Sequence, residues 1–446
     1  MALFGTNGVR GVANVEMTPE MAMSLAKSIG TFRNGKFAVG MDTRHSGAML
    51  KNAVIAGLLS TGCSVVDLGI APTPCVQYYV KRHADAGMII TASHNPPEYN
   101  GIKGIAGDGT EMSRQDEAAI EKIYFARTFK NANWSETGSV ACADPKPEYI
   151  DGIVNAVDAE AIRAKRFTVV CDTGCGAASV TTPFLLRKLG CKVITLNAQV
   201  DGTFPGRNPE PTGNEINDLK AAVKTAGANL GVAHDADADR AVFIDDKGRF
   251  VNEDVLLALM TQYKLQRKPG STVVTPVSSS SLIEDIAKQY DSNVIWTMVG
   301  SIHVARKMME VGAIFGGEGN GGLIFPEFQY CRDGGMSAGS MLEMLAKTGR
   351  KLSDIVDALP SYSSVKEKIK CKDKDRVLKS IEDDVRREKA KADLTDGIKI
   401  FRPEGWVLVR ASGTEPIIRV FAESRTDSGA RTLADYGVGL VNKYNR

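Results

Sequence analysis

The sequence predicts an α/β fold, because strand-like and helix-like segments alternate along three successive parts of the chain. Short apolar and β-branched segments typical of buried strands are separated by longer segments with helical spacing. This pattern restarts at residues 167–171 and again at residues 271–275. Such alternation favours mainly parallel sheets with helices on both faces. Reactive side chains are then expected at strand ends and in the loops that follow them.

The first part shows the alternation most clearly. Thr18 and Pro19 predict the start of a helix, because threonine caps helix N-termini and proline suits the first turn. A strand over residues 37–40, a helix over 47–60 and a second strand over 64–67 are expected to follow.

The second and third parts repeat the order. Strands are predicted over residues 167–171 and 192–196, with a helix over 181–189 between them. After the first strand of the third part, Ser281 and Glu284 predict a capping box at the start of the next helix.

Turn-forming residues mark the boundaries between the parts. They lie at residues 144–147, 245–248 and 359–362, where proline, aspartate and glycine gather. We expect domains over residues 1–150, 151–250, 251–362 and 363–446. In the last of these, the charge-rich segment 366–391 predicts a solvent-exposed helix face.

Bulk properties fit an ordinary globular protein of 446 residues, with 43% hydrophobic and 24% charged residues. A net charge of +2 gives no basis for binding nucleic acid or a membrane surface. We see no signal peptide and no apolar stretch of membrane-spanning length. The eight cysteines lack paired metal spacing and read as thiols in a reducing compartment. We therefore expect a cytoplasmic protein, and the sequence leaves its oligomeric state open.

The segment 91–97 (TASHNPP) follows an apolar strand over residues 87–90, so Ser93 and His94 are expected at the strand tip. The prolines prevent any regular continuation. A hydroxyl beside an imidazole, ten residues before Lys103, suits a covalent nucleophile or a phosphate carrier. A capped turn would show the same residues, so the choice between a nucleophile and a structural turn depends on the other motifs.

A second motif, between two predicted strands, carries Asp235, Asp237 and Asp239. Alternate residues of an extended backbone place their side chains on one side, and three close carboxylates call for a cation. A site with few protein ligands favours Mg²⁺ over Ca²⁺. An EF-hand is rejected, because Arg240 occupies the position of its required glycine. A solvated acidic turn is the alternative.

Two further loops suit a phosphorylated sugar. Near the C-terminus, a turn between predicted strands offers donors suited to phosphate: Arg410, Ser412, Gly413, Thr414 and Arg419. In the glycine-rich segment 316–322, Glu318 and Asn320 can bond to sugar hydroxyls. A flexible hairpin would show the same glycines, but no helix opens there, so a dinucleotide fingerprint is excluded.

Nucleophile, metal site, phosphate clamp and hydroxyl reader together describe phosphoryl transfer on a sugar. The four motifs occur in the order found in the α-D-phosphohexomutases, which the chain resembles over its whole length. Residues 3–11 (LFGTNGVRG) are similar to the phosphoglucosamine mutase branch in its archaeal form. The resemblance implies three similar mixed-sheet α/β domains and a smaller α+β C-terminal domain around a central cleft, with the last domain mobile.

The resemblance also implies residue roles. Ser93 would be the active-site phosphoserine and would hold Mg²⁺ together with Asp235, Asp237 and Asp239. The groups around the transferring phosphoryl would be Arg10, His94, Lys103 and Arg240. Sugar hydroxyls would be bound by Glu318 and Asn320. The far phosphate would be bound by Arg410, Ser412, Gly413, Thr414 and Arg419.

The implied reaction interconverts hexose 6-phosphate and hexose 1-phosphate through a bound hexose 1,6-bisphosphate. Glucosamine is the first choice of sugar, with mannose or glucose as the alternative. Lys103 and His94 are both candidates for the acid/base role. A Mg²⁺-dependent sugar phosphatase and a non-enzymatic sugar-phosphate sensor are the alternatives of another class. The second phosphate clamp argues against the phosphatase, and the intact nucleophile argues against the sensor.

The chain departs from the family's pattern in three loops. Ala236 stands where a glycine is usual, without removing a metal ligand. Asn320 replaces a serine, and Gly322 replaces a histidine that many bacterial members carry, which puts an acid/base role of that loop in doubt. Residues 299–301 lack the acidic or histidine residue of relatives, and His303 lies out of register. Whether Ser301 or His303 touches substrate is left open.

Overall fold

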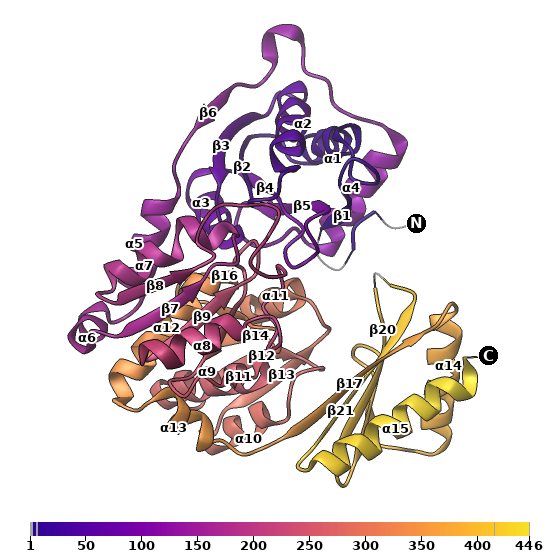
Figure 1. The fold of residues 1–446 in the computed structure, drawn as a ribbon. Helices are drawn as coiled ribbons and strands as arrows, with labels where there is room; N and C mark the ends of the chain where they lie inside the picture. The colour runs from indigo at the N-terminus through magenta and orange to yellow at the C-terminus, as the bar shows by residue number, and fades with distance from the viewer. Residues whose placement is uncertain (1–2, 6–7, 414, 446) are drawn as a thin grey trace.

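The computed structural model describes residues 3–5, 8–413 and 415–445, whose strands form four sheets (Figure 1). Three sheets are mixed, with parallel strands on one side and antiparallel strands on the other, and the fourth is antiparallel. Helices accompany every sheet. The predicted α/β class, with three α/β domains and a different C-terminal domain, is confirmed.

The first sheet has the order β1-β5-β4-β2-β3-β6. Its strands are β1 (Val9–Val12), β2 (Lys36–Met41), β3 (Ser64–Ile70), β4 (Ala86–Ile90), β5 (Tyr99–Ala106) and β6 (Val140–Cys142). Its helices are α1 (Pro19–Phe32), α2 (Gly47–Ser60), α3 (Thr73–His83) and α4 (Arg114–Ala126), and a 3₁₀ turn covers Trp134–Glu136. The predicted cap of α1 is present, because Thr18 Oγ1 accepts a hydrogen bond from the Met21 amide.

The second sheet repeats this layout in the order β11-β10-β9-β7-β8. Its strands are β7 (Thr168–Asp172), β8 (Lys192–Leu196), β9 (Leu230–His234), β10 (Ala241–Ile244) and β11 (Phe250–Val251). Its helices are α5 (Lys146–Ala156), α6 (Ala159–Lys165), α7 (Thr182–Lys188) and α8 (Asn217–Ala226), and a 3₁₀ turn covers Ala177–Val180. The antiparallel pair β9–β10 holds the acidic motif in its connection.

The third sheet has the order β13-β12-β14-β15-β16. Its strands are β12 (Thr272–Pro276), β13 (Asn293–Thr297), β14 (Phe315–Glu318), β15 (Gly322–Phe325) and β16 (Gln329–Arg332). Its helices are α9 (Glu253–Arg267), α10 (Leu282–Gln289), α11 (Ser301–Val311), α12 (Gly334–Thr348) and α13 (Leu352–Asp357). The glycine-rich motif is the hairpin between β14 and β15.

The fourth sheet has the order β17-β21-β20-β19-β18 and carries two helices. The elements are β17 (Ser363–Lys370), α14 (Lys374–Arg387), β18 (Ala392–Asp393), β19 (Ile398–Arg402), β20 (Gly405–Ala411), β21 (Ile417–Ser424) and α15 (Asp427–Tyr444). The charge-rich segment is therefore only partly helical, which corrects the sequence prediction. Its first residues lie in β17, where exposed and half-buried side chains alternate as in a strand with one solvated face.

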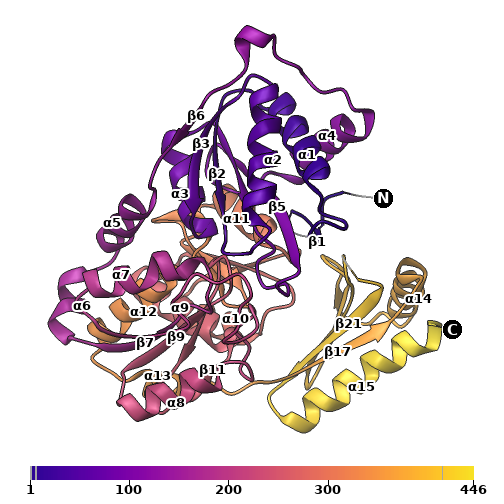
Figure 2. The same cartoon turned by 45° about the horizontal axis from the view of Figure 1, so that its top comes forward.

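The first three sheets share one hydrophobic core, whereas the fourth has a core of its own. At the shared core, the Tyr78 and Phe328 rings stack with centroids 4.8 Å apart, and Tyr149 OH donates to Asp333 Oδ1 at 2.6 Å. In both views, the fourth sheet with α14 and α15 forms a separate unit beside the other three (Figures 1 and 2). The first three domains are thus built as one body, and the fourth is attached to it.

The predicted capping box at α10 is wrong. Ser281 has helical backbone angles, and its side chain makes no capping hydrogen bond. Instead its hydroxyl accepts a bond from Trp406 Nε1 at 2.9 Å, and its amide donates to Glu423 Oε1 at 2.8 Å. Both partners belong to the fourth sheet, so a tertiary contact replaces the local cap.

Candidate active site

Ser93 lies just beyond the end of β4, in a loop that the following prolines keep from continuing as a strand. Its side chain is buried, and its φ of 51° lies in the left-handed region, which is uncommon for a residue other than glycine. The Ser93 amide donates to Thr91 Oγ1 at 2.8 Å. Such a conformation persists only where surrounding contacts fix it, as is common at functional sites.

Those contacts come from Arg44, a buried residue that the sequence analysis did not single out. Its guanidinium donates to the carbonyl oxygen of Ser93 at 2.8 Å and to that of Tyr99 at 2.9 Å. Asp42 Oδ2 accepts from Arg44 Nε at 3.1 Å and from Thr91 Oγ1 at 2.6 Å. Asp42 and Arg44 follow directly after β2, so their place at a strand end was a signal that could have identified them.

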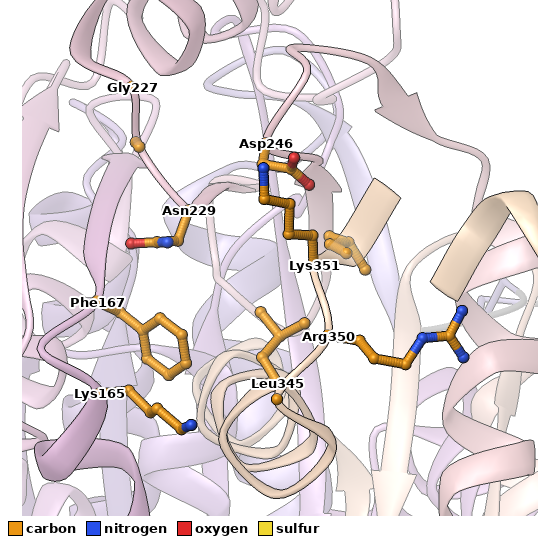
Figure 3. A pocket seen from close by; sticks show the side chains of 11 residues that line it. Lys165, Phe167, Gly227, Asn229, Asp246, Leu345, Arg350 and Lys351 are labelled. Atoms are coloured by element: carbon orange, nitrogen blue, oxygen red, sulfur yellow. The ribbon is translucent and has the colours of Figure 1, made fainter. Parts of the chain in front are cut away.

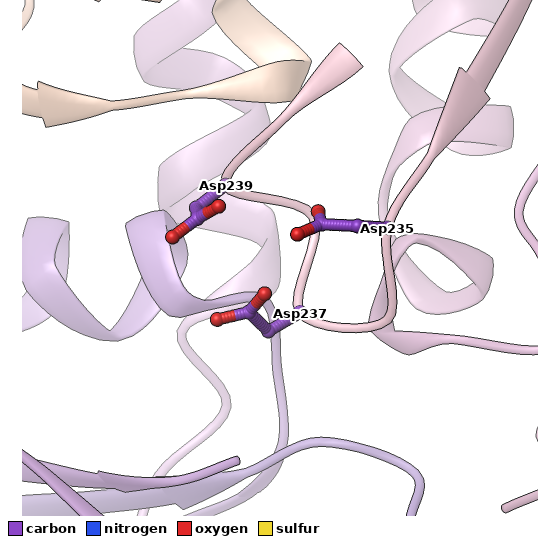
Figure 4. A group of neighbouring side chains, drawn as sticks. All are labelled: Asp235, Asp237 and Asp239. Atoms are coloured by element: carbon purple, nitrogen blue, oxygen red, sulfur yellow. The ribbon is translucent and has the colours of Figure 1, made fainter. Parts of the chain in front are cut away.

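The three aspartates of the β9–β10 connection are buried and gather on one side of the loop (Figure 4). One carboxylate oxygen from each lies within 4.8 Å of the others. Ser93 Oγ donates to Asp235 Oδ2 at 2.9 Å, although 142 residues separate the two in sequence. The fold therefore joins the predicted nucleophile to the predicted metal site.

Protein donors hold one oxygen of Asp237 and one of Asp239. Lys103 Nζ donates to Asp237 Oδ2 at 2.8 Å and to Asp239 Oδ2 at 3.2 Å. Thr73 Oγ1 also donates to Asp237 Oδ2, at 2.6 Å. The second oxygens, Asp237 Oδ1 and Asp239 Oδ1, are buried without a hydrogen-bond partner among the described residues. Unpaired buried carboxylate oxygens facing a third carboxylate suit a small divalent cation that prefers oxygen ligands.

The pKa values of the three carboxylates are not all shifted in the same direction. Burial, reinforced by Asp237 and Asp239, raises the pKa of Asp235 well above its usual range. Burial also acts to raise the pKa of Asp237, but the charge and hydrogen bond of Lys103, together with Thr73 and Arg10, outweigh it, so that pKa is lowered. Lys103 itself has a raised pKa, since the two aspartates outweigh the effect of its burial. The lysine is therefore charged at neutral pH.

Arg10, His94 and Arg240 surround the serine and the aspartates. Arg10 Nη1 donates to Asn95 Oδ1 at 2.8 Å, and Arg240 Nε lies 3.8 Å from Asp239 Oδ1. Burial, followed by the charges of Arg240 and Arg10, lowers the pKa of His94 to about 2. His94 is therefore a neutral imidazole in an electropositive surrounding, where a phosphate would find positive charge.

Glu318 ends β14, and both of its carboxylate oxygens have partners. Oε1 accepts from the Gly300 amide at 3.0 Å, and Oε2 accepts from Arg332 Nη1 at 3.2 Å. Asn320 Oδ1 accepts from the Gly322 amide at 3.1 Å, so the asparagine shapes its own loop. Arg332 is a second buried cation that the sequence analysis missed, although its position at the end of a strand was again a signal.

The predicted phosphate loop lies between β20 and β21. Arg410 Nε donates to Asp396 Oδ2 at 2.7 Å, and Arg419 Nη2 donates to Glu415 Oε2 at 2.7 Å. Ser412 is buried and Gly413 is exposed, whereas Thr414 lies outside the described residues. The two arginines thus pair with carboxylates of their own domain. Asp396 Oδ2 also accepts from the Val299 amide at 2.9 Å, which ties this loop to the third domain.

The departures noted in the sequence have structural explanations. Ala236 is buried, and its φ is not in the left-handed region, so an alanine fits where a glycine is usual. Ser301 Oγ donates to Glu111 Oε2 at 2.9 Å, which joins the third domain to the first. His303 lies half-buried in the first turn of α11, and burial lowers its pKa.

A cavity of about 350 Å³ is lined by residues of the second and third domains, none of which belongs to the site described above (Figure 3). Phe167 and Asn229 line it and directly precede β7 and β9, whereas Asp235 follows the opposite end of β9. The cavity and the aspartates therefore lie at opposite edges of the second sheet. It is a feature separate from the site around Ser93.

His234, directly before the aspartates, predicts a measurable pH dependence of stability. Burial lowers its pKa to about 4, so the folded state favours the neutral ring. The stability gained by keeping this ring neutral is fully present above pH 6.5. It is lost as the pH falls towards 4, because the unfolded chain binds the proton at a higher pH than the folded protein does. His234→Asn can still donate to the Arg240 carbonyl, which His234 Nδ1 contacts at 3.0 Å, but it does not titrate. The wild-type advantage in unfolding free energy should shrink by about 3 kcal/mol between pH 6.5 and 4. Chemical denaturation of both proteins at each pH tests this, and a constant difference would contradict it.

The sequence matches four family models that together cover most of the chain. Their descriptions are phosphoglucomutase/phosphomannomutase α/β/α domains I, II and III and the C-terminal domain, over residues 1–131, 147–248, 252–362 and 367–437. Among the described residues, no helix combines the length and the apolar character needed to cross a membrane.

Relatives and solved structures agree with these models. The chain is 46% identical to a phosphoglucomutase/phosphomannomutase of Thermococcus kodakarensis, covering 99% of this chain and 98% of that protein. It is 42% identical to a phosphoglucosamine/phosphogalactosamine mutase of Sulfurisphaera tokodaii, covering 97% of each. A phosphoglucomutase/phosphomannomutase family protein of Burkholderia thailandensis has the same fold, with a TM-score of 0.89, 25% identity and coverage of 100% and 98%.

A more distant structure is an N-acetylphosphoglucosamine mutase of Aspergillus fumigatus, solved with GlcNAc-6P and magnesium. Its TM-score is 0.65 at 15% identity, with coverage of 100% of this chain and 96% of that one, so the likeness is one of fold. Full-length identity above 40% and the four consecutive domain models carry the assignment. The chain therefore belongs to the phosphoglucomutase/phosphomannomutase family and is a phosphohexomutase, an enzyme of the isomerase class.

Proposed function

We propose that this enzyme interconverts hexose 6-phosphate and hexose 1-phosphate through a phosphoserine at Ser93 and a bound hexose 1,6-bisphosphate. The observation that carries the proposal is the 2.9 Å contact between Ser93 Oγ and Asp235, beside two carboxylates that each have one oxygen without a hydrogen-bond partner among the described residues. A serine that faces a cation site can carry a phosphoryl group whose charge the cation neutralises.

The cation of this proposal is Mg²⁺, held by Asp235, Asp237, Asp239 and the phosphate on Ser93. When bound, Mg²⁺ would draw charge from the phosphoryl oxygens and lower the barrier to transfer. The donor set fits a hard cation, because one oxygen of Asp237 and one of Asp239 are buried without a partner among the described residues. Lys103 donates to Oδ2 of both carboxylates and Thr73 donates to Oδ2 of Asp237, and these bonds fix the orientation of the two side chains.

In the transfer, the bond between phosphorus and the Ser93 oxygen breaks as a sugar hydroxyl oxygen bonds to phosphorus. The hydroxyl loses a proton and the serine oxygen gains one, so a group that exchanges protons is needed. Lys103 carries a proton at neutral pH, whereas a His94 pKa of about 2 makes the imidazole a weak base. We therefore assign the acid/base role to Lys103 and assign His94, Arg10 and Arg240 to binding the phosphoryl group.

The sugar would lie between this site and the fourth domain. Glu318 and Asn320 would bind its hydroxyls. The far phosphate would be bound by Arg410, Ser412, Gly413, Thr414 and Arg419. Because each end of the substrate carries phosphate in turn, the bisphosphate must turn around before the second transfer. A phosphate at this loop would compete with Asp396 for the Arg410 guanidinium.

Glucosamine phosphate is the proposed preferred sugar, with mannose and glucose phosphates as the runner-up. The N-terminal motif and the relative named phosphoglucosamine/phosphogalactosamine mutase favour glucosamine, whereas the relative named phosphoglucomutase/phosphomannomutase supports the runner-up. Phosphorus NMR tests both the mutase reaction and the preferred sugar. Glucosamine, mannose and glucose 6-phosphates are each incubated with enzyme, Mg²⁺ and a trace of hexose 1,6-bisphosphate. We expect a 1-phosphate signal that grows fastest with glucosamine 6-phosphate. Release of inorganic phosphate would identify a phosphatase, and unchanged spectra would identify a sugar-phosphate sensor.

A further inference from the structure

Arg332 joins the metal loop of the second domain to the sugar loop of the third. It ends β16, and its side chain is 5% exposed. Nη2 donates to Asp239 Oδ2 at 2.6 Å, and Nη1 donates to Glu318 Oε2 at 3.2 Å. One planar guanidinium thus holds a carboxylate from each of the two loops.

The sugar loop leaves room for this arginine. A Cβ atom at Gly322 would lie 2.3 Å from Arg332 Cδ, closer than real contacts allow, and 3.0 Å from Asn320 Oδ1, which is a tight contact. Any larger residue at position 322 would therefore displace the Arg332 stem. The position of Arg332 therefore depends on the absence of a side chain at Gly322.

The two bonds have different consequences for the two loops. The Gly300 amide and Arg332 occupy one oxygen each of Glu318, so the direction of this carboxylate is fixed. At Asp239, Arg332 and Lys103 both bind Oδ2, which leaves Oδ1 without a hydrogen-bond partner among the described residues and 3.8 Å from Arg240 Nε. The same cation also opposes a nearby divalent ion by charge repulsion.

We propose that Arg332 is a positioning residue that orients Glu318 for the sugar hydroxyls and weakens the hold of the aspartates on the divalent cation. The inference rests on the proposed function of the same site. A buried ion pair contributes little net stability compared with a well-packed apolar residue, so stability alone does not account for Arg332. We expect Arg332 to affect ligand binding. It should strengthen the binding of the sugar phosphate and weaken the binding of the divalent cation.

Arg332→Met tests this in the Ser93→Ala background, where turnover does not complicate binding. Glucosamine 6-phosphate affinity, measured by calorimetry, should fall by about 10-fold or more, since Glu318 loses a charged hydrogen-bond donor. Affinity for Mn²⁺ as a probe of the cation site, measured by electron paramagnetic resonance, should rise by about 3- to 10-fold. A folding defect would weaken both ligands together.

A second variant and a control complete the design. Gly322→Ala keeps the charge but displaces the Arg332 stem, and should weaken the sugar phosphate without abolishing Mn²⁺ binding. Arg267→Met removes an ion pair with buried Glu343 outside the site, and should change neither affinity. Unchanged sugar affinity, or parallel loss of both ligands in folded Arg332→Met, would overturn the proposal. Because binding is measured without catalysis, a failure of the mutase assay is distinguishable from a failure of this inference.

Discussion

Replacing Ser93 with alanine is expected to lower kcat by about 10⁴-fold or more, because the transferring phosphoryl group loses its carrier. Fold and cation site should persist. The hydroxyl contacts one oxygen of Asp235, whose other oxygen still accepts from the Arg240 amide at 3.2 Å. Activity should therefore vanish while Mn²⁺ affinity stays within a few-fold of that of the unphosphorylated wild type.

Transfer of the phosphoryl group to the protein checks this prediction. Incubation with hexose 1,6-bisphosphate should phosphorylate the wild-type protein, as seen by intact-protein mass spectrometry, and leave Ser93→Ala unlabelled. Ser28→Ala is the matched control, because Ser28 is a buried serine of the same domain whose hydroxyl, within the described part of the chain, donates only to the Ser24 carbonyl. A labelled Ser93→Ala protein, or one that retains a tenth of the activity, would show that another residue carries the phosphoryl group.

Replacing Lys103 with methionine is expected to have the next largest effect, on both catalysis and stability. Loss of an acid/base group lowers kcat by about 10²- to 10⁴-fold. Removing one partner from a buried ion pair typically costs about 3–5 kcal/mol, because the remaining charges stay buried. Lys103 is the cation that Asp237 and Asp239 share, so both carboxylates would lose a donor.

The distinctive result is the response to Mg²⁺. A divalent cation can replace the lost charge of Lys103→Met, so the Mg²⁺-induced rise in Tm should be larger in the variant than in the wild type. Lys51→Met removes a lysine–aspartate pair with Asp67 elsewhere in the first domain and should leave the Mg²⁺ response unchanged. A smaller Mg²⁺ response in Lys103→Met would mean that the lysine helps to build the cation site instead of sharing its charge.

Much of the fold was predictable because its signals are local. Apolar runs such as 87–90 and 230–233 became β4 and β9, and the residues after them became the serine and aspartate loops. Helix α1 begins after Thr18 as its capping residue predicts. Prediction failed where a distant partner decided the outcome. Ser281 contacts Trp406 instead of capping its helix, and the first charged residues of segment 366–391 pair with β21 as strand β17.

The sequence by itself determined which chemical groups the enzyme has: a serine at a strand tip, three alternating aspartates, a glycine-rich hairpin and an arginine-flanked turn. Motifs report such groups because the geometry that they need lies within a few residues. Only the tertiary structure decided which groups act on one another. It placed Ser93 against Asp235 and Lys103 against Asp237, and it brought Arg44 beneath the serine loop. It also placed Arg332 between Asp239 and Glu318. These buried groups lie 14 to 142 residues apart, and the packing of strand ends, within one sheet or between sheets, brings them together where no local pattern records the pairing.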